Sequence, residues 1–207
     1  MVFKALLILF FDTAEAGIIT LMKLIIVRHG ETEGNVKKII QSKEGGKLTD
    51  KGRKQAKELG RQLKEKFKID MVFCSPMSRC QETLEGILSE YPISGEILMS
   101  SLLKEREFGE YEGVEDCMID WKEVNKDSKL NQEMGVESWS ELGKRIGLFL
   151  EDLKLENNEK STVLVISHGD TIRAMVNKVT KQELRYPERV VKNAEIIELD
   201  FDTSLDF

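Results

Sequence analysis

Short apolar runs alternate with longer amphipathic stretches along the 207-residue chain. Four of the runs are rich in β-branched residues, which predicts buried strands. They cover residues 24–27, 71–74, 163–166 and 196–199, and a weaker candidate covers residues 96–99.

The stretch from residue 50 to residue 67 predicts an amphipathic helix. Its apolar side chains recur at helical spacing, while lysine, arginine and glutamate fill the other positions. The apolar positions are Ala56, Leu59, Leu63 and Phe67.

Two further helices are predicted from their first residues. Ser75 followed by Pro76 is typical of a helix N-cap with proline at the first helical position, so the second strand should turn directly into a helix that ends near Glu90. Ser138, with Glu141 three residues later, forms the pattern of a capping box ahead of a helix that leads into the strand at residue 163.

This alternation of strands and helices predicts an α/β protein, a three-layer αβα sandwich with a mostly parallel central sheet. Ligand sites in such sheets lie at the carboxyl ends of the strands. The polar stretch 110–135 is interpreted as a loop-rich excursion with one short helix near Trp121. A chain of this length predicts a single domain, which we assign to residues 22–207.

Residues 1–21 are treated separately because their charged start and the apolar residues 5–11 are similar to a short signal peptide. The apolar run is at the minimum length, Asp12 and Glu15 introduce charges directly after it, and a strong strand begins at Met22. We therefore interpret the segment as an extension ahead of a natural start at Met22. It is too short to span a bilayer.

Composition narrows the classes of function. A formal net charge of −6 argues against a nucleic-acid surface, and 33% charged with 41% apolar residues describes a soluble globular protein rather than a membrane protein. Three cysteines without a CxxC pair predict no disulfide framework and fit a reducing cytoplasm. With only two histidines, a metal site of histidine and cysteine is hard to assemble, and a site made of carboxylates alone is left open without support. No cofactor is predicted.

The two histidines occupy matching places. His29 and His168 each follow a predicted buried strand and precede a glycine, Gly30 or Gly169. If the two strands are neighbours in the sheet, the imidazoles meet at its carboxyl edge, and each glycine lets the backbone turn sharply and approach a ligand closely. Two imidazoles beside Arg28 suit phosphate chemistry, because a neutral imidazole can attack phosphorus while a guanidinium holds the equatorial oxygens.

These motifs, in this order, resemble the histidine phosphatase superfamily, also called the phosphoglycerate mutase-like family. The resemblance covers residues 23–199, nearly everything beyond residues 1–21. It rests on Arg28-His29-Gly30-Glu31-Thr32 with Asn35, Leu48-Thr49 with Gly52 and Gln55-Ala56, Ser75-Pro76 with Arg79 and Thr83, Leu103, Glu105, Gly109, Glu112-Gly113, and Ser167-His168-Gly169 with Ile172-Arg173.

The resemblance implies a phosphoglycerate mutase-like fold and a role for each matching residue. His29 is implied to be the nucleophile that becomes phosphohistidine, and Glu105 the proton donor. Arg28, Asn35, Arg79 and His168 are implied to surround and bind the transferred phosphoryl group.

Each assignment has a simpler competitor when the residue is considered alone. Arg79 is equally compatible with an ordinary helix residue and Asn35 with a turn former. Glu105 lies beside Lys104, Arg106 and Glu107, a pattern typical of a solvated charge run. Glu107 and Glu110 are the next candidates for the proton donor.

The sequence departs from the family between Asn35 and Leu48. The family commonly has a glutamine-glycine or threonine-glycine pair here, followed by an aspartate. Gln41 matches, but Ser42 replaces the glycine, and residues 43–47 come after it. That loop faces the substrate in the family, so the preference for a leaving group is left open.

The resemblance favours a metal-independent phosphomonoester phosphatase acting on a small phosphorylated substrate, with no nucleic-acid or membrane partner and with a homo-oligomer left open. The alternative enzyme is a cofactor-dependent phosphoglycerate mutase, since Glu105-Arg106 followed by Phe108-Gly109 is similar to the mutase form of that motif. An alternative of another class is a catalytically inactive phosphate-binding or interaction module, because a fold alone does not establish activity.

Overall fold

A five-stranded sheet forms the centre of the molecule. In the computed structural model, which describes residues 21–43, 46–156, 161–182 and 190–204, its strands are β1 (Leu21–Arg28), β2 (Met71–Cys74), β3 (Glu96–Met99), β4 (Thr162–Ser167) and β5 (Ile196–Asp202). Their order is β3-β2-β4-β1-β5, and only β5 runs antiparallel to its neighbour among these strands. All five predicted strands are present, so the mostly parallel sheet is confirmed.

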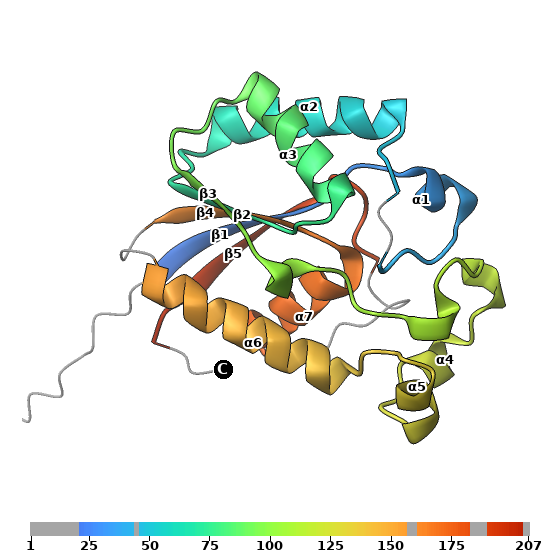
Figure 1. The fold of residues 1–207 in the computed structure, drawn as a ribbon. Coiled ribbons are helices and arrows are strands. Elements are labelled where there is room, and N and C mark those ends of the chain that lie inside the picture. The colour runs from blue at the N-terminus through green and yellow to red at the C-terminus, as the bar shows by residue number, and fades with distance from the viewer. Residues whose placement is uncertain (1–20, 44–45, 157–160, 183–189, 205–207) are drawn as a thin grey trace, which may run out of the picture.

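Helices cover both faces of this sheet (Figure 1). Helices α2 (Asp50–Lys66) and α3 (Ser78–Glu90) lie on one face, and α6 (Trp139–Glu156) and α7 (Gly169–Thr180) lie on the other. Residues of β1 alternate between the two cores: Ile25 packs on the α2 and α3 side, whereas Leu24 packs on the α6 and α7 side. The predicted three-layer αβα sandwich is confirmed.

Helix α3 begins two residues later than the sequence pattern predicts. Its N-cap is Met77, and the prediction of an N-cap at Ser75 is wrong. Ser75 continues the sheet instead, because its backbone N donates to the carbonyl of Ile166 at 3.0 Å. Its hydroxyl group is engaged by His168.

The predicted capping box of α6 is confirmed. The backbone N of Ser138 donates to Glu141 Oε2 at 2.9 Å, and the backbone N of Glu141 donates to Ser138 Oγ at 3.1 Å. The helix therefore starts at Trp139, directly after the serine.

Residues 107–138, which we call the cap, form a small layer beyond the carboxyl edge of the sheet (Figure 1). The cap contains the 3₁₀ turns Gly109–Tyr111 and Asp116–Met118 and the short helices α4 (Trp121–Val124) and α5 (Lys129–Glu133). The short helix expected near Trp121 is confirmed as α4, and α5 is additional. A separate apolar cluster built on Phe108, Ile119, Val124 and Val136 holds the cap together.

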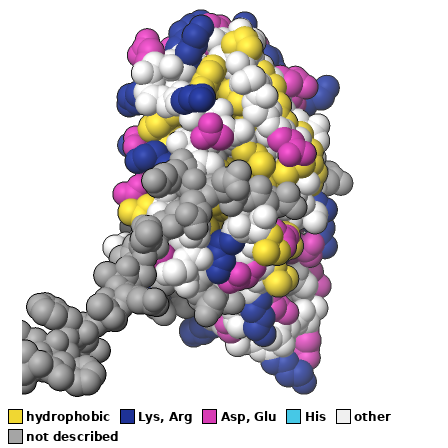
Figure 2. All heavy atoms as spheres, turned by 90° about the vertical axis from the view of Figure 1, so that its left-hand side faces the viewer, with side chains coloured by type: hydrophobic (Ala, Val, Ile, Leu, Met, Phe, Trp, Pro, Cys, Tyr) yellow, Lys and Arg dark blue, Asp and Glu magenta, His cyan; other side chains and the backbone are white. Residues whose placement is uncertain are grey.

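Two remaining short elements are α1 (Glu33–Lys37) and the 3₁₀ turn Ser101–Leu103. We expected residues 1–21 to be an extension ahead of Met22. Apart from Leu21, these residues lie outside the described part of the chain. No helix in the described residues is long and apolar enough to cross a membrane. Figure 2 views the side where the parallel strands begin; acidic, basic and apolar side chains are interspersed there, and no histidine shows.

Candidate active site

The two histidines meet at the carboxyl edge of the sheet because their strands are neighbours. Strands β1 and β4 run parallel, with Arg28 opposite Ser167. His29 and His168 directly follow these positions, and their ring centroids are 5.3 Å apart. Both rings are buried. The two matching sequence motifs therefore form one site.

His29 is a neutral imidazole with one nitrogen left for chemistry. Its Nδ1 donates to the carbonyl of Gly30 at 2.8 Å, so Nε2 is the unprotonated nitrogen. Burial, and then the positive charges of Arg28 and Arg79, lower the pKa of His29 well below its usual value of 6.5. This is the form of the ring that can act as a nucleophile.

His168 is fixed by contacts at both ring nitrogens. Arg79 Nε donates to its Nδ1 at 3.1 Å, and its Nε2 donates to Ser75 Oγ at 2.8 Å. The Sγ atom of Cys80 lies 3.4 Å from the same Nε2. Burial, followed by the charge of Arg79, lowers the pKa of His168 well below 6.5, so this ring is also neutral.

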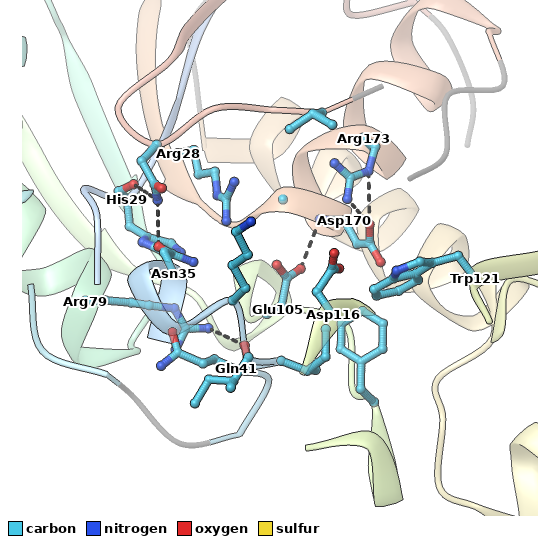
Figure 3. A pocket seen from close by; sticks show the side chains of 17 residues that line it. Arg28, His29, Asn35, Gln41, Arg79, Glu105, Asp116, Trp121, Asp170 and Arg173 are labelled. Carbon is cyan, nitrogen blue, oxygen red and sulfur yellow. Dashed lines mark hydrogen bonds and ion pairs between the residues drawn. The ribbon is translucent and has the colours of Figure 1, made fainter. Parts of the chain in front are cut away.

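Arg28, at the end of β1, and Arg79, in the first turn of α3, bring two positive charges to the site. Arg28 Nη1 donates to the carbonyl of Val191, while its buried Nε has no hydrogen-bond partner among the described residues. Arg79 Nη2 donates to the carbonyl of Gln41 at 3.2 Å (Figure 3). These carbonyl acceptors are neutral, so they orient the guanidinium groups without cancelling their charges.

The carboxyl group of Glu105 lies at the N-terminus of α7. Its Oε1 accepts hydrogen bonds from the backbone N of Arg106 at 2.9 Å, of Asp170 at 3.1 Å and of Thr171 at 3.2 Å. These bonds fix one oxygen and leave Oε2 as the oxygen that can exchange a proton with a ligand. A charge-run interpretation of Glu105 is therefore wrong, because its side chain lines the same cavity as His29.

The two other candidate carboxylates lie elsewhere. The side chain of Glu107 is 56% exposed and lies 3.3 Å from Lys43 Nζ, and Glu110 is exposed. Neither lines the cavity that contains His29. Of the three glutamates considered, the structure brings only Glu105 to the histidines.

Asn35 reaches the site from α1. Its Oδ1 accepts from Asn193 Nδ2 at 2.9 Å and from the backbone N of Thr32 at 3.2 Å. Because its oxygen is occupied in this way, the amide NH₂ group of Asn35 is the part left to donate to a ligand.

The glycines after the histidines leave room for neighbouring groups. Neither Gly30 nor Gly169 has a positive φ, so the backbone conformation alone does not require a glycine at either position. A Cβ atom on Gly30 would lie 2.6 Å from the carbonyl oxygen of Gly52, which only a glycine avoids. A Cβ atom on Gly169 would lie 3.6 Å from Glu105 Oε2 and would narrow the cavity.

Ser42, where the family commonly has glycine, joins the loop between Asn35 and Leu48 to the cap. Its backbone N donates to Glu112 Oε1 at 2.9 Å, and its hydroxyl group donates to Glu112 Oε2. The backbone N of Phe108 donates to Ser42 Oγ at 3.3 Å. Ser42 therefore anchors this loop to the cap through both its backbone N and its hydroxyl group.

A cavity of about 460 Å³ unites these groups and has two parts (Figure 3). The inner part contains Arg28, His29, Asn35 and Arg79. The outer part contains Asp116, Trp121, Asp170 and Arg173, and Glu105 lies between the two groups. Among the described residues, no cluster of three His, Cys, Asp or Glu side chains is arranged to hold a metal ion.

Two further cavity residues are not identified by the sequence pattern. Asn193 Nδ2 donates to the carbonyl of His29 at 3.1 Å as well as to Asn35, and Asp170 binds Arg173. Asn193 lies in a turn, next to Ala194, which has a φ of 57°. Asparagine is common in turns, so the sequence alone does not distinguish Asn193 from an ordinary turn residue.

Comparisons with known proteins agree with this arrangement. The family model described as histidine phosphatase superfamily (branch 1) matches residues 24–205. A 2,3-bisphosphoglycerate-dependent phosphoglycerate mutase from Brucella melitensis is 31% identical over 178 residues, which cover 82% of this chain and 85% of the relative. The mutase of the same name from Mesorhizobium japonicum is 33% identical over 162 residues, covering 74% and 79% of the two chains.

Solved structures share the fold. Phosphoserine phosphatase from Entamoeba histolytica, determined in complex with 3-phosphoglyceric acid, superimposes with a TM-score of 0.72 at 28% identity, covering 86% of this chain and 89% of that one. Phosphoglycerate mutase from Bacillus anthracis gives a TM-score of 0.74 at 22% identity, with 89% and 90% coverage. The phosphoglycerate mutase-like fold is thus confirmed, and the chain belongs to branch 1 of the histidine phosphatase superfamily.

Proposed function

We propose that this protein is a phosphomonoester phosphatase that carries the phosphoryl group transiently on His29. The observation that carries the proposal is a buried, neutral imidazole whose Nε2 is available beside two guanidinium groups. A neutral nucleophile next to fixed positive charge suits attack on a phosphate dianion, since Arg28 and Arg79 can hold its equatorial oxygens.

In the first step, His29 Nε2 attacks phosphorus, and the N–P bond forms as the ester P–O bond breaks. The departing alkoxide oxygen takes a proton from Glu105 Oε2 and leaves as an alcohol. Arg28, Arg79 and the amide of Asn35 are proposed to balance the charge on the transferred group. Neutral His168 adds a polar ring next to that group.

In the second step, water attacks the phosphorus atom of phosphohistidine. Glu105, now a carboxylate, accepts a proton from the water as the new P–O bond forms and the N–P bond breaks. Inorganic phosphate leaves, and both His29 and Glu105 return to their starting protonation states.

The choice of water as the acceptor rests on the charges of the outer part of the cavity. The Brucella and Mesorhizobium relatives are named after 2,3-bisphosphoglycerate, a compound with two phosphate groups and one carboxylate. Retaining such a compound requires cations beyond those at the inner phosphate. Here the cations Lys38 and Arg173 line the cavity together with the anions Asp116 and Asp170, so the wall is balanced.

Arg173 is additionally committed to a neighbour, because its Nε donates to Asp170 Oδ1 at 3.0 Å. A balanced wall favours a phosphatase over a mutase. Phosphoglycerate mutase is the second candidate function, and the names of the curated relatives support it.

Trapping the phosphoenzyme tests the proposal. The protein is mixed with p-nitrophenyl phosphate, quenched in alkali and mapped by mass spectrometry, since phosphohistidine is base-stable and acid-labile. Phosphate should be found on His29, and His29→Ala should abolish both the adduct and turnover. Label on a serine or an aspartate would refute the mechanism.

The acceptor is tested on the trapped intermediate. Phosphoenzyme diluted into buffer should decay to inorganic phosphate within the turnover time. A long-lived phosphoenzyme that instead passes its phosphoryl group to 3-phosphoglycerate would assign the protein as a mutase. A binding module would show neither an adduct nor turnover above background.

A further inference from the structure

The outer part of the cavity has an aromatic and aliphatic wall that the phosphotransfer steps do not use. The rings of Phe108 and Trp121 pack edge to face, with centroids 5.8 Å apart and an interplanar angle of 86°. Ile39 and Ile40, from the segment after α1, line the same cavity. Trp121 lies on the side of the cavity away from His29 (Figure 3).

This wall is fixed by backbone hydrogen bonds and by the apolar core of the cap. The backbone N of Ile40 donates to the carbonyl of Val114 at 2.9 Å, and Ile39 pairs with Glu115 in an antiparallel bridge. Phe108 is only 6% exposed and packs in the cap cluster. The surface is therefore preformed, so little conformational entropy is lost when a ligand packs against it.

The outer part of the cavity offers little to a second anion. Its charged side chains balance, because the anions Asp116 and Asp170 accompany the cations Lys38 and Arg173. A cavity of about 460 Å³ also exceeds the needs of a phosphate group alone and falls in the range of pockets that enclose a larger organic group.

We infer that the outer part of the cavity is a subsite for an apolar, ring-bearing alcohol portion of the substrate, with Trp121 as its principal contact. This inference rests on the proposed phosphatase function, because the alcohol portion is the leaving group of that reaction. The substrate class is then a phosphomonoester of an alcohol that carries an aromatic or aliphatic ring.

Binding of alkylphosphonates tests the subsite without any turnover. Phosphonates have a C–P bond in place of the ester oxygen, so they occupy the site but cannot be hydrolysed. Titration calorimetry compares ethylphosphonate with 2-phenylethylphosphonate and 4-phenylbutylphosphonate, the two lengths allowing for the reach to Trp121. At least one phenyl compound should bind about tenfold more tightly or better, the gain expected from burying one ring.

Variants identify the contact. Trp121→Ala should reduce the ratio of Kd values between ethylphosphonate and the phenyl compound towards one, whereas Trp121→Phe, which keeps a ring, should preserve most of it. Met118→Ala is the matched control: Met118 belongs to the cap but is 75% exposed and does not line the cavity, so the ratio should be retained.

Equal affinity for the ethyl and phenyl compounds in the unaltered protein, or a ratio that survives Trp121→Ala, would overturn the inference. Tighter binding of 3-phosphoglycerate than of every phenyl compound, lost in Lys38→Ala, would also overturn it and indicate an anionic leaving group. These results are independent of catalysis. Selective binding combined with an absence of turnover on the corresponding phosphate esters would leave the subsite standing and refute the phosphatase instead.

Discussion

Arg106 Nη1 lies 3.5 Å from Asp170 Oδ2, and both side chains are buried. Asp170 is in the first turn of α7, where its backbone N donates to Glu105 Oε1. Arg106 is also bound to the cap, since its Nε donates to the carbonyl of Glu137 at 2.7 Å and its Nη2 to that of Val124 at 3.0 Å. One buried ion pair thus connects the cap, α7 and the candidate proton donor.

Arg106→Met should lower the free energy of unfolding by about 1–3 kcal/mol, because it removes one of the two arginines paired with the buried carboxylate of Asp170 and leaves the carbonyl groups of Glu137 and Val124 without this donor. Urea denaturation followed by circular dichroism measures the change. Lys104→Ala, which removes an exposed cation two residues away, should stay within about 0.5 kcal/mol. A loss below about 1 kcal/mol for Arg106→Met would show that the ion pair contributes little.

The same residue shows where sequence reasoning stops. A run of four charged residues, 104–107, is typical of a solvated surface, and nothing local distinguishes Arg106 from its neighbours. Its guanidinium lies 4.9 Å from the centroid of the Trp139 ring and 5.4 Å from that of Phe108. Those partners come from segments whose meeting is decided by tertiary structure, so the burial of Arg106 could not be predicted.

The sheet and the histidine pair were predictable because they depend on local patterns in the sequence. A strand inside the sheet is a continuous apolar run, so β2 has the predicted bounds. The edge strand β3 also has the predicted bounds, although most of its residues are exposed. The matching positions of His29 and His168 needed only one assumption, that their strands are adjacent. Ser75 could not be assigned correctly, because its hydroxyl group binds a histidine 93 residues away instead of capping α3.

A second prediction concerns pH. The folded state holds both histidines neutral, with pKa values well below 6.5, whereas the unfolded chain binds protons near that value. The unfolded state therefore binds more protons below pH 6.5. Stability should be complete above that pH and should fall as the pH is lowered through it, by up to about 1 kcal/mol per histidine and pH unit.

The chain has only two histidines, so their ring signals in NMR report the titration directly. Neither signal should titrate near pH 6.5 in the folded protein, and urea denaturation between pH 7.5 and 5.5 should show the loss of stability. A histidine that titrates at its ordinary pKa would contradict the neutral nucleophile.

The third prediction is that activity survives a strong chelator. The proposed mechanism assigns charge stabilisation to Arg28 and Arg79, and the removal of a divalent ion should not affect these groups. Turnover of p-nitrophenyl phosphate should be the same before and after treatment with EDTA and gel filtration. Complete loss of turnover, restored by one divalent metal, would require a different source of positive charge.

The last prediction concerns Glu105 and depends on the leaving group. If Glu105 Oε2 protonates the departing oxygen, Glu105→Gln should slow hydrolysis of an alkyl phosphate by about 10²–10⁴-fold, because an alkoxide leaves poorly without a proton. Phosphorylation by p-nitrophenyl phosphate should change much less, since nitrophenolate leaves readily without one. Attack of water on the intermediate still lacks its base, so phosphohistidine should accumulate after a burst of nitrophenolate, and rapid-quench kinetics measures both phases. Glu107→Gln is the matched control, because that carboxylate is exposed and outside the cavity, and it should leave both phases unchanged. Wild-type behaviour of Glu105→Gln with both classes of ester would mean that the proton donor is another group.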